Sequence, residues 1–223
     1  CALGFSVCMT GTLGLRRNLS TAEIVDQIRL AKRDFPDCQV RNIVFMGMGE
    51  PLHNVDGVVA ATKILQSPRG LMVSKRRLTV STAGVIPGIH RLSTEAEVLL
   101  AVSLNAPNQK IRERLMPIAR KYPLDELMAT LKRWPLAPRQ RLTLEYVLVA
   151  GINDQLEHAR ELVRLISHLR CKVNLIPFNP FPGTDLQAPS KETTQTFFEA
   201  IHAKDVRVTV RKSRGQDIQA ACG

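Results

Sequence analysis

The stretch Gly47-Met48-Gly49-Glu50-Pro51, which follows the apolar run 42–46, contains the residue types most suited to binding a small ligand. A short apolar run with β-branched residues is typical of a buried strand. Glycines at a strand end let the backbone approach a ligand closely, and a proline stiffens the turn that carries the Glu50 carboxylate. These residues predict a pocket for a small cationic amine.

Small or polar residues also follow three other predicted strands. They are Ser81 after strand 78–80, Ser103 and Asn105 after strand 97–102, and Asn179 after strand 172–176. In parallel α/β folds the ligand lies at the carboxyl ends of the strands. We therefore expect these residues to converge on one site with Glu50, although they are far apart in the sequence.

Strand-like and helix-like segments alternate along the chain, which is typical of parallel α/β architecture. The remaining predicted strands are 142–149 and 206–210, and the predicted helices are 20–32, 58–65, 109–115, 124–133, a segment after Asp154, and 190–203. Ser20 with Glu23 has the pattern of a helix-capping box, and Asp154 with Glu157 is predicted to cap a later helix. No internal repeat is visible.

The chain has 223 residues, of which 44% are hydrophobic, so it can bury a sizeable core. Its net charge of +11 favours a polyanionic partner such as nucleic acid. The basic residues gather at Arg16 with Arg17, Lys75 to Arg77, Arg112 with Arg114, Arg139 with Arg141, and Arg211 with Lys212 and Arg214. The apolar runs are shorter than the roughly 20 residues of a membrane span, and no signal peptide is visible. We expect a cytoplasmic protein and a monomer.

The five cysteines are Cys1, Cys8, Cys38, Cys171 and Cys222. Their odd number and wide spacing are unlike a secreted disulfide framework, so reduced thiols are expected. Cys171 begins a predicted strand and is interpreted as a core residue. Some of the other thiols are expected to have chemical roles.

Residues 1–8 resemble the CxxxCxxC loop of radical S-adenosylmethionine enzymes, in which three thiolates hold a four-iron cluster. Cys1 and Cys8 match the first and third ligands, whereas Phe5 stands at the middle position. The resemblance continues along the chain, to the members of that family that methylate carbon 2 of adenine in large-subunit ribosomal RNA and in transfer RNA. The matching segments are 17–20, 47–52, 74–77, 80–85, 103–108, 175–181 and 211–215.

This resemblance implies a partial (β/α) barrel whose first strand would precede Cys1. Residues 1–223 would form the radical S-adenosylmethionine catalytic domain, without the small N-terminal RNA-binding domain of the family. The implied cofactors are S-adenosylmethionine and a [4Fe-4S] cluster, with Cys1 and Cys8 as cluster ligands.

The resemblance also implies a cofactor pocket. Gly49 and Glu50 would hold the amino group of S-adenosylmethionine, and the other implied pocket residues are Ser81, Ser103, Leu104, Asn105 and Asn179. Asn105 stands where the family often has His, and an Asn side chain can still hydrogen-bond a ribose or a carboxylate.

Cys222 matches the cysteine that carries a methyl group in the family. Carbon 2 of adenine is not nucleophilic, so a covalent carrier that holds a carbon radical against the ring explains the chemistry. The alternative is a relative without a cluster that binds RNA without radical catalysis, because Phe5 offers no ligand. Activity at carbon 8 of adenine is a third hypothesis, although Pro51 after Glu50 favours the carbon-2 group.

Overall fold

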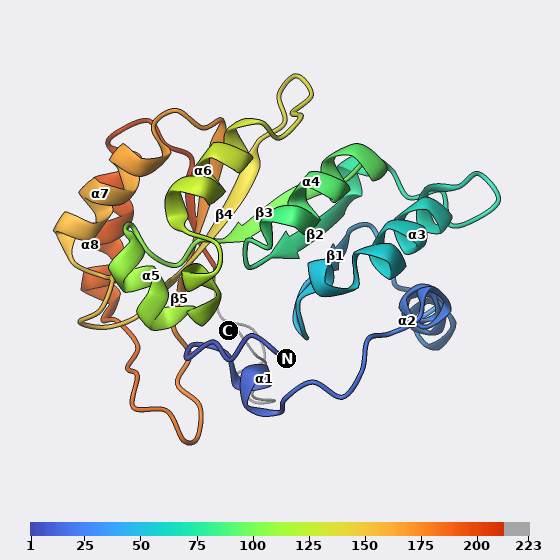
Figure 1. Ribbon diagram of the computed structural model, residues 1–223, viewed down its shortest axis with the longest axis horizontal. Helices are drawn as coiled ribbons and strands as arrows, with labels where there is room; N and C mark the ends of the chain where they lie inside the picture. The colour runs from blue at the N-terminus through green and yellow to red at the C-terminus, as the bar shows by residue number, and fades with distance from the viewer. Residues whose placement is uncertain (212–223) are drawn as a thin grey trace.

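The computed structural model describes residues 1–211, which form a parallel α/β fold (Figure 1). Cys222 and the basic residues Lys212 and Arg214 lie outside the described residues. Within residues 1–211 the sheet has six strands in the sequential order β1-β2-β3-β4-β5-β6. They are β1 (Ile43–Phe45), β2 (Leu78–Thr82), β3 (Leu99–Ser103), β4 (Leu142–Leu148), β5 (Cys171–Pro177) and β6 (Val208–Val210).

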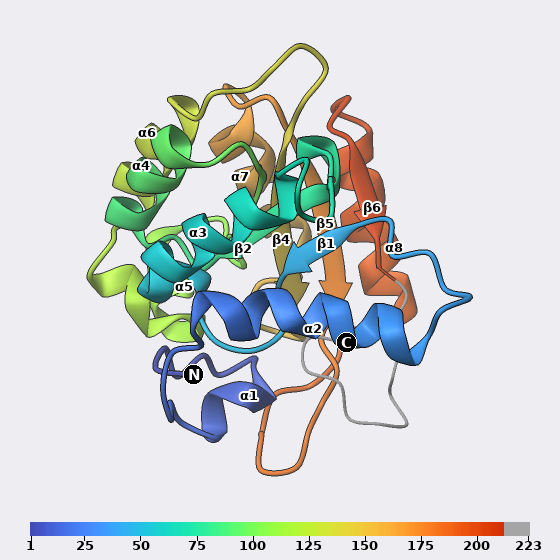
Figure 2. The same cartoon turned by 90° about the vertical axis from the view of Figure 1, so that its right-hand side faces the viewer.

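Every neighbouring pair of strands is parallel, so all the strands point the same way. In Figure 2 the arrowheads of β4 and β5 point toward the N-terminal segment and α1 (Met9–Thr12). This arrangement is an open section of a (β/α) barrel, and it confirms the fold class predicted from the alternation of elements. It also brings the carboxyl ends of the strands to one edge.

Helices follow the strands and cover the sheet. They are α2 (Thr21–Asp34), α3 (Val55–Gln66), α4 (Ile86–Glu95), α5 (Gln109–Leu115), α6 (Leu124–Lys132), α7 (Leu156–Ile166) and α8 (Lys191–His202), with 3-10 turns at Pro51–Asn54, Lys75–Arg77 and Pro117–Arg120. The core lies between these helices and the sheet and includes Leu78, Leu100 and Leu144 from the strands and Leu65, Leu92 and Leu127 from the helices. Cys171 is buried in the same core, as predicted.

The strand before Glu50 differs from its prediction as a buried strand. β1 has only three residues and lies at the edge of the six-stranded sheet, and Val44 at its centre is 55% exposed. The apolar composition predicted a strand correctly, but burial depends on what covers the strand, which composition does not reveal.

One of the two predicted helix caps is correct. The Ser20 side chain accepts a hydrogen bond from the Glu23 backbone amide, and the Glu23 side chain accepts one from Ser20 in return. The prediction for Asp154 was wrong, because Gln155 caps α7 together with His158. The Asp154 carboxylate instead accepts hydrogen bonds from Gly151 and from the Gln155 side chain.

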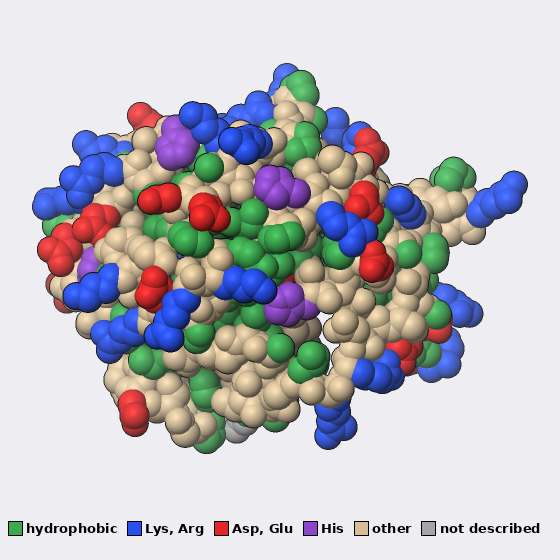
Figure 3. Space-filling view, viewed as in Figure 1, with side chains coloured by type: hydrophobic (Ala, Val, Ile, Leu, Met, Phe, Trp, Pro, Cys, Tyr) green, Lys and Arg blue, Asp and Glu red, His purple; other side chains and the backbone are tan. Residues whose placement is uncertain are grey.

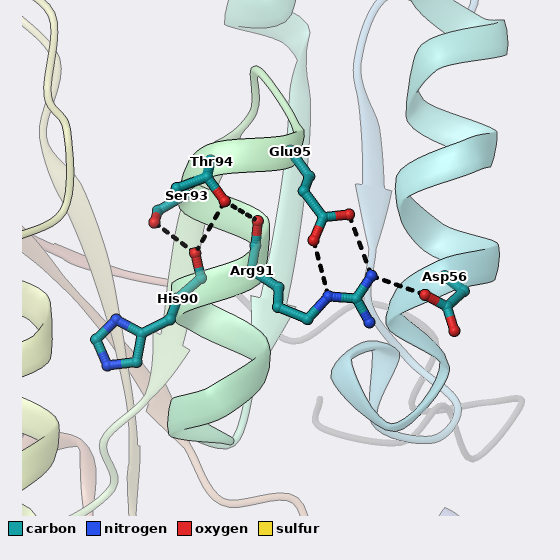
Figure 4. Close-up of polar contacts among 6 residues, drawn as sticks. All are labelled: Asp56, His90, Arg91, Ser93, Thr94 and Glu95. Atoms are coloured by element: carbon teal, nitrogen blue, oxygen red, sulfur yellow. Dashed lines mark hydrogen bonds and ion pairs between the residues drawn. The ribbon is translucent and has the colours of Figure 1, made fainter.

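Helix α4 was not predicted, and it packs beside α3 through a surface ion-pair cluster (Figure 4). Arg91 donates to Glu95 one turn away at 2.8 Å and to Asp56 of α3 at 2.7 Å. No helix within residues 1–211 has the length and apolar composition needed to cross a membrane.

Candidate functional site

A pocket lies where the carboxyl ends of the strands meet the N-terminal segment. It contains seven residues predicted from the sequence: Cys1, Cys8, Gly49, Glu50, Ser81, Ser103 and Asn105. Further lining side chains include Phe5, Thr82, Glu145 and Arg211. Residues from the first and last described parts of the chain therefore meet in one cavity, as the parallel topology requires.

The Glu50 carboxylate is held by three donors from the turn and from the end of β2. One oxygen accepts the Leu52 backbone amide at 2.9 Å and the Thr82 hydroxyl at 2.8 Å. The other oxygen accepts the Ala83 backbone amide at 2.7 Å. These contacts fix the carboxylate at the pocket wall before any ligand binds.

The electrostatics of Glu50 reflect its enclosed carboxyl group. Desolvation raises the pKa of Glu50 above its ordinary value, and the hydrogen bonds from Ala83, Leu52 and Thr82 oppose that rise. A cation placed against this carboxylate would favour its charged form, because opposite charges attract strongly in a partly desolvated site.

The strand-end residues have different local roles in the pocket. Ser81 is buried at the end of β2, whereas Ser103 is half-buried at the end of β3. Asn105 is buried in a left-handed conformation with φ of 56°. Its amide oxygen accepts from the Val147 backbone at 2.9 Å, and its amide nitrogen lies 3.3 Å from the Met116 sulfur. The Asn105 side chain thus links β3 to β4 beside the pocket.

Two predicted pocket residues lie apart from the cavity lining. Leu104 is fully buried, and its backbone amide donates to the Glu145 carbonyl oxygen at 2.9 Å. Asn179 is half-buried just beyond β5 and is not among the residues that line the pocket. Any contact of these two residues with a ligand stays a prediction.

The N-terminal cysteine segment forms one wall of the pocket. Cys1 and Cys8 are half-buried, and Phe5 between them packs against the hydrophobic core. Ser6 fastens this segment to the end of α5, because both its amide and its hydroxyl donate to the Leu115 carbonyl at 3.3 Å. Within residues 1–211 no group of three or more His, Cys, Asp or Glu side chains could hold a metal ion.

Glu145 was missed in the sequence, although it lines the pocket. It is only 7% exposed and stands in the middle of β4, a strand that is otherwise apolar apart from Thr143. Asn174 of β5 donates to its carboxylate at 2.8 Å. Burial raises the pKa of Glu145, while the Asn174 hydrogen bond and the charges of Arg211 and Lys172 lower it. A charged residue inside a buried strand was the available signal, because such residues are rarely buried without a partner or a function.

The prediction of an exposed basic cluster was wrong for Arg112. We expected it to form an exposed cluster with Arg114, but Arg112 is fully buried and donates to the Ala83 carbonyl oxygen at 2.7 Å. Desolvation lowers its pKa to about 10. Its other guanidinium nitrogens have no hydrogen-bond partner in the structure. Other Lys and Arg side chains spread over the face seen in Figure 3, with acidic side chains among them.

Comparison with known proteins identifies the family to which this architecture corresponds. Residues 1–165 match the model described as the radical SAM superfamily. The whole chain is 50% identical to the "Dual-specificity RNA methyltransferase RlmN" of Syntrophobacter fumaroxidans over 224 aligned residues, and it covers 66% of that protein. It is 52% identical to the protein of the same name from Geotalea uraniireducens and covers 64% of it. The chain therefore spans slightly less than two thirds of the length of these relatives.

A solved structure is similar over the whole chain. The crystal structure of a radical SAM methyltransferase from Sphaerobacter thermophilus superposes with a TM-score of 0.95 at 45% identity. The superposition covers 100% of this chain and 66% of the other. These likenesses confirm the family resemblance inferred from the motifs.

Proposed function

Because this chain belongs to the radical SAM superfamily, we propose that it is the catalytic domain of an RNA methyltransferase that acts on carbon 2 of adenine. The observation that carries the proposal is the identity of about 50% over the whole chain to relatives named as RNA methyltransferases. We propose large-subunit ribosomal RNA and transfer RNA as substrates. Because ribosomes and transfer RNA work in the cytoplasm, we place the protein there.

We propose S-adenosylmethionine, the methyl donor of the superfamily, as the ligand of this pocket. The pocket is open to solvent, and its lining brings together Gly49, Glu50 and Ser103. Gly47 and Gly49 have φ of 115° and 81°, so the backbone at this wall has a conformation that only glycine adopts easily. At both glycines a Cβ atom would project into open space, so the backbone here is accessible to a ligand.

The residues of this wall would hold the amino-acid part of the donor. Glu50 presents a fixed carboxylate to the ammonium group, and Gly49 lets the ligand approach the backbone. Ser81 and Ser103 add hydroxyl groups, which can both donate and accept hydrogen bonds. We propose Cys222, outside the described residues, as the side chain whose sulfur carries the methyl group to RNA.

The residues do not fit the three-thiolate cluster that the superfamily uses. Cys1 and Cys8 stand at the first and third ligand positions of the N-terminal segment, and Phe5 occupies the middle position with a hydrocarbon ring. No described side-chain group supplies a set of three metal ligands. This observation favours a second candidate function, in which the protein binds RNA and S-adenosylmethionine without radical catalysis.

Iron and sulfide measurements after anaerobic reconstitution distinguish the two functions. The protein and its Phe5→Cys variant would be reconstituted side by side, with Phe5→Leu as a control for loss of the ring. About four irons per chain in the wild type and in the Cys variant would support the methyltransferase, because a substitute ligand would then complete the cluster. Iron in the Cys variant alone would support the second function.

Methyl transfer to RNA tests the proposed reaction itself. The reconstituted protein would receive a one-electron reductant, ribosomal or transfer RNA, and S-adenosylmethionine labelled in its methyl group. The RNA would then be digested and analysed by mass spectrometry. We expect 2-methyladenosine from the wild type and none from Cys222→Ala. A labelled nucleoside other than 2-methyladenosine would overturn the choice of carbon 2.

A further inference from the structure

The pocket combines three charged side chains of a particular pattern. Glu50 and Glu145 are carboxylates, and Arg211 is a guanidinium. S-adenosylmethionine has the complementary set of charges, because it carries an ammonium group, a carboxylate group and a positively charged sulfonium. Each of the three charged side chains therefore corresponds to one ligand charge of opposite sign.

The position of Glu145 makes it part of the ligand wall. In the sheet it is in register with Ser103 of β3 on one side and with Asn174 of β5 on the other. Its backbone carbonyl accepts the amides of Leu104 and Asn105 at 2.9 Å and 3.3 Å. Glu145 therefore stands next to the strand end that carries Ser103 and Asn105, two other residues of the pocket.

The Glu145 carboxylate is held on one side and open on the other. One oxygen accepts from Asn174, whose own amide oxygen accepts from the Thr209 hydroxyl at 3.2 Å. The second oxygen accepts no hydrogen bond within residues 1–211. It is also not fully enclosed by the protein, and Glu145 lines the pocket, so this oxygen is accessible to a ligand.

The nearby cations do not neutralise Glu145 by direct contact. Arg211 and Lys172 influence it through space. Among the described residues, however, neither forms an ion pair with it. A carboxylate with one positioned oxygen and no direct counterion is available to a cationic ligand group.

We propose that Glu145 selects the sulfonium of S-adenosylmethionine, so that it is the residue that distinguishes the methyl donor from the spent product. Glu50 serves the ammonium group in this arrangement, and that group is present in both molecules. S-adenosylhomocysteine lacks the sulfonium charge, and a neutral thioether gains little from a carboxylate. The inference rests on the proposed binding of S-adenosylmethionine.

Binding measurements with the two ligands test this role without any catalytic turnover. Isothermal titration calorimetry would give the affinities of the wild type, Glu145→Gln and Glu50→Gln for S-adenosylmethionine and S-adenosylhomocysteine. We expect Glu145→Gln to lower the ratio of the two affinities by about tenfold, which is the effect of losing one favourable charge contact. Glu50→Gln should weaken both ligands and leave the ratio unchanged. Glu97→Gln, the same change at an exposed residue, is the matched control.

The outcomes separate the inference from the function on which it rests. If the wild type binds neither ligand, the proposed function fails. If the wild type binds S-adenosylmethionine and Glu145→Gln leaves the ratio unchanged, the role of Glu145 is overturned and the function stands. Equal weakening of both ligands by Glu145→Gln would also overturn it, because contact with the ribose, the adenine or the amino-acid part would act on both molecules.

A ligand series on the wild type keeps the inference testable if Glu145→Gln does not fold. Sinefungin carries a cationic amine in place of the methylated sulfur. We expect sinefungin to bind with an affinity close to that of S-adenosylmethionine and about tenfold tighter than S-adenosylhomocysteine. Equal affinities of sinefungin and S-adenosylhomocysteine would contradict selection by charge.

Discussion

Glu50 and Glu145 line the same pocket, but the protein occupies their oxygens to different extents. Glu50 follows an edge strand and accepts three hydrogen bonds, two of them from backbone amides. Glu145 stands inside the long strand β4, and its carboxylate accepts one, from the Asn174 side chain. The first carboxylate therefore helps to hold the local fold together, whereas the second is held in place by the fold and keeps an oxygen for a ligand.

The largest expected difference is in stability. Glu50→Ala would leave two amides and a hydroxyl without their acceptor, whereas Glu145→Ala would leave only the Asn174 amide. We expect losses of about 3 kcal/mol and about 1 kcal/mol in the free energy of unfolding, since each unpaired enclosed donor is costly. Urea denaturation of both variants at neutral pH measures the difference. Equal losses would contradict the comparison.

Gly84→Ala tests the backbone segment whose Ala83 amide holds the Glu50 carboxylate. Gly84 follows Ala83, has φ of 101°, and a Cβ there would lie 3.1 Å from both the Arg112 guanidinium and the Leu127 side chain. We expect a loss of about 2 kcal/mol, measured by the same urea titration. Gly151→Ala is the control, because Gly151 also has a positive φ of 68° but has open space around a Cβ. It should lose about 1 kcal/mol.

The pH dependence of stability should report the burial of Glu145. Because burial raises the folded pKa of Glu145 above its ordinary value of 4.5, the folded state holds the proton more tightly than the unfolded state. The contribution of Glu145 is fully present below that value and is lost as the pH rises through the folded pKa. Glu145→Gln should flatten this decline in urea denaturation between pH 4.5 and neutrality, and Glu97→Gln should not. An unchanged slope in Glu145→Gln would show that Glu145 is solvated.

Arg91→Ala should have the smallest effect on stability of the variants considered. Arg91 joins α4 to α3 on the outer surface, where its ion pairs with Glu95 and Asp56 are exposed to solvent. Such pairs contribute little, so we expect the melting temperature to change by no more than about 2 °C and ligand affinity to stay the same. If Arg91→Ala lowered the melting temperature as much as Gly84→Ala does, the contact between α3 and α4 would support the pocket.

The sequence predicted elements where composition and period agree, and it failed where packing decides. Helix 109–115 was predicted at its observed bounds, since its apolar residues recur at helical spacing and Asn108 caps it. Helix α4 was missed because Pro87, Gly88 and the β-branched Thr94 weaken its local pattern. Its stability comes from packing, with Ile89 and Leu92 buried against the core.

The candidate site was predictable in part for the same reason. Strand-end positions follow from parallel topology, so Glu50, Ser81 and Ser103 could be assigned to one pocket before the structure was known. Glu145 lies within a strand rather than after it, and its exposure to the pocket depends on which face of β4 turns inward. Arg112 has the sequence context of a surface residue on a short helix, and only the packing of α5 against Ala83 shows that it is buried.

The sequential strand order has a consequence for how the protein opens. Seven residue pairs join β4 to β5, whereas three join β1 to β2. Because hydrogen exchange follows local opening, amides of β4 should exchange slowly and those of the short edge strand β1 should exchange faster. The two carboxylates thus belong to regions with different opening free energies. A ligand that spans both would slow exchange in β1 far more than in β4, because binding at Glu50 requires this short edge strand to stay paired.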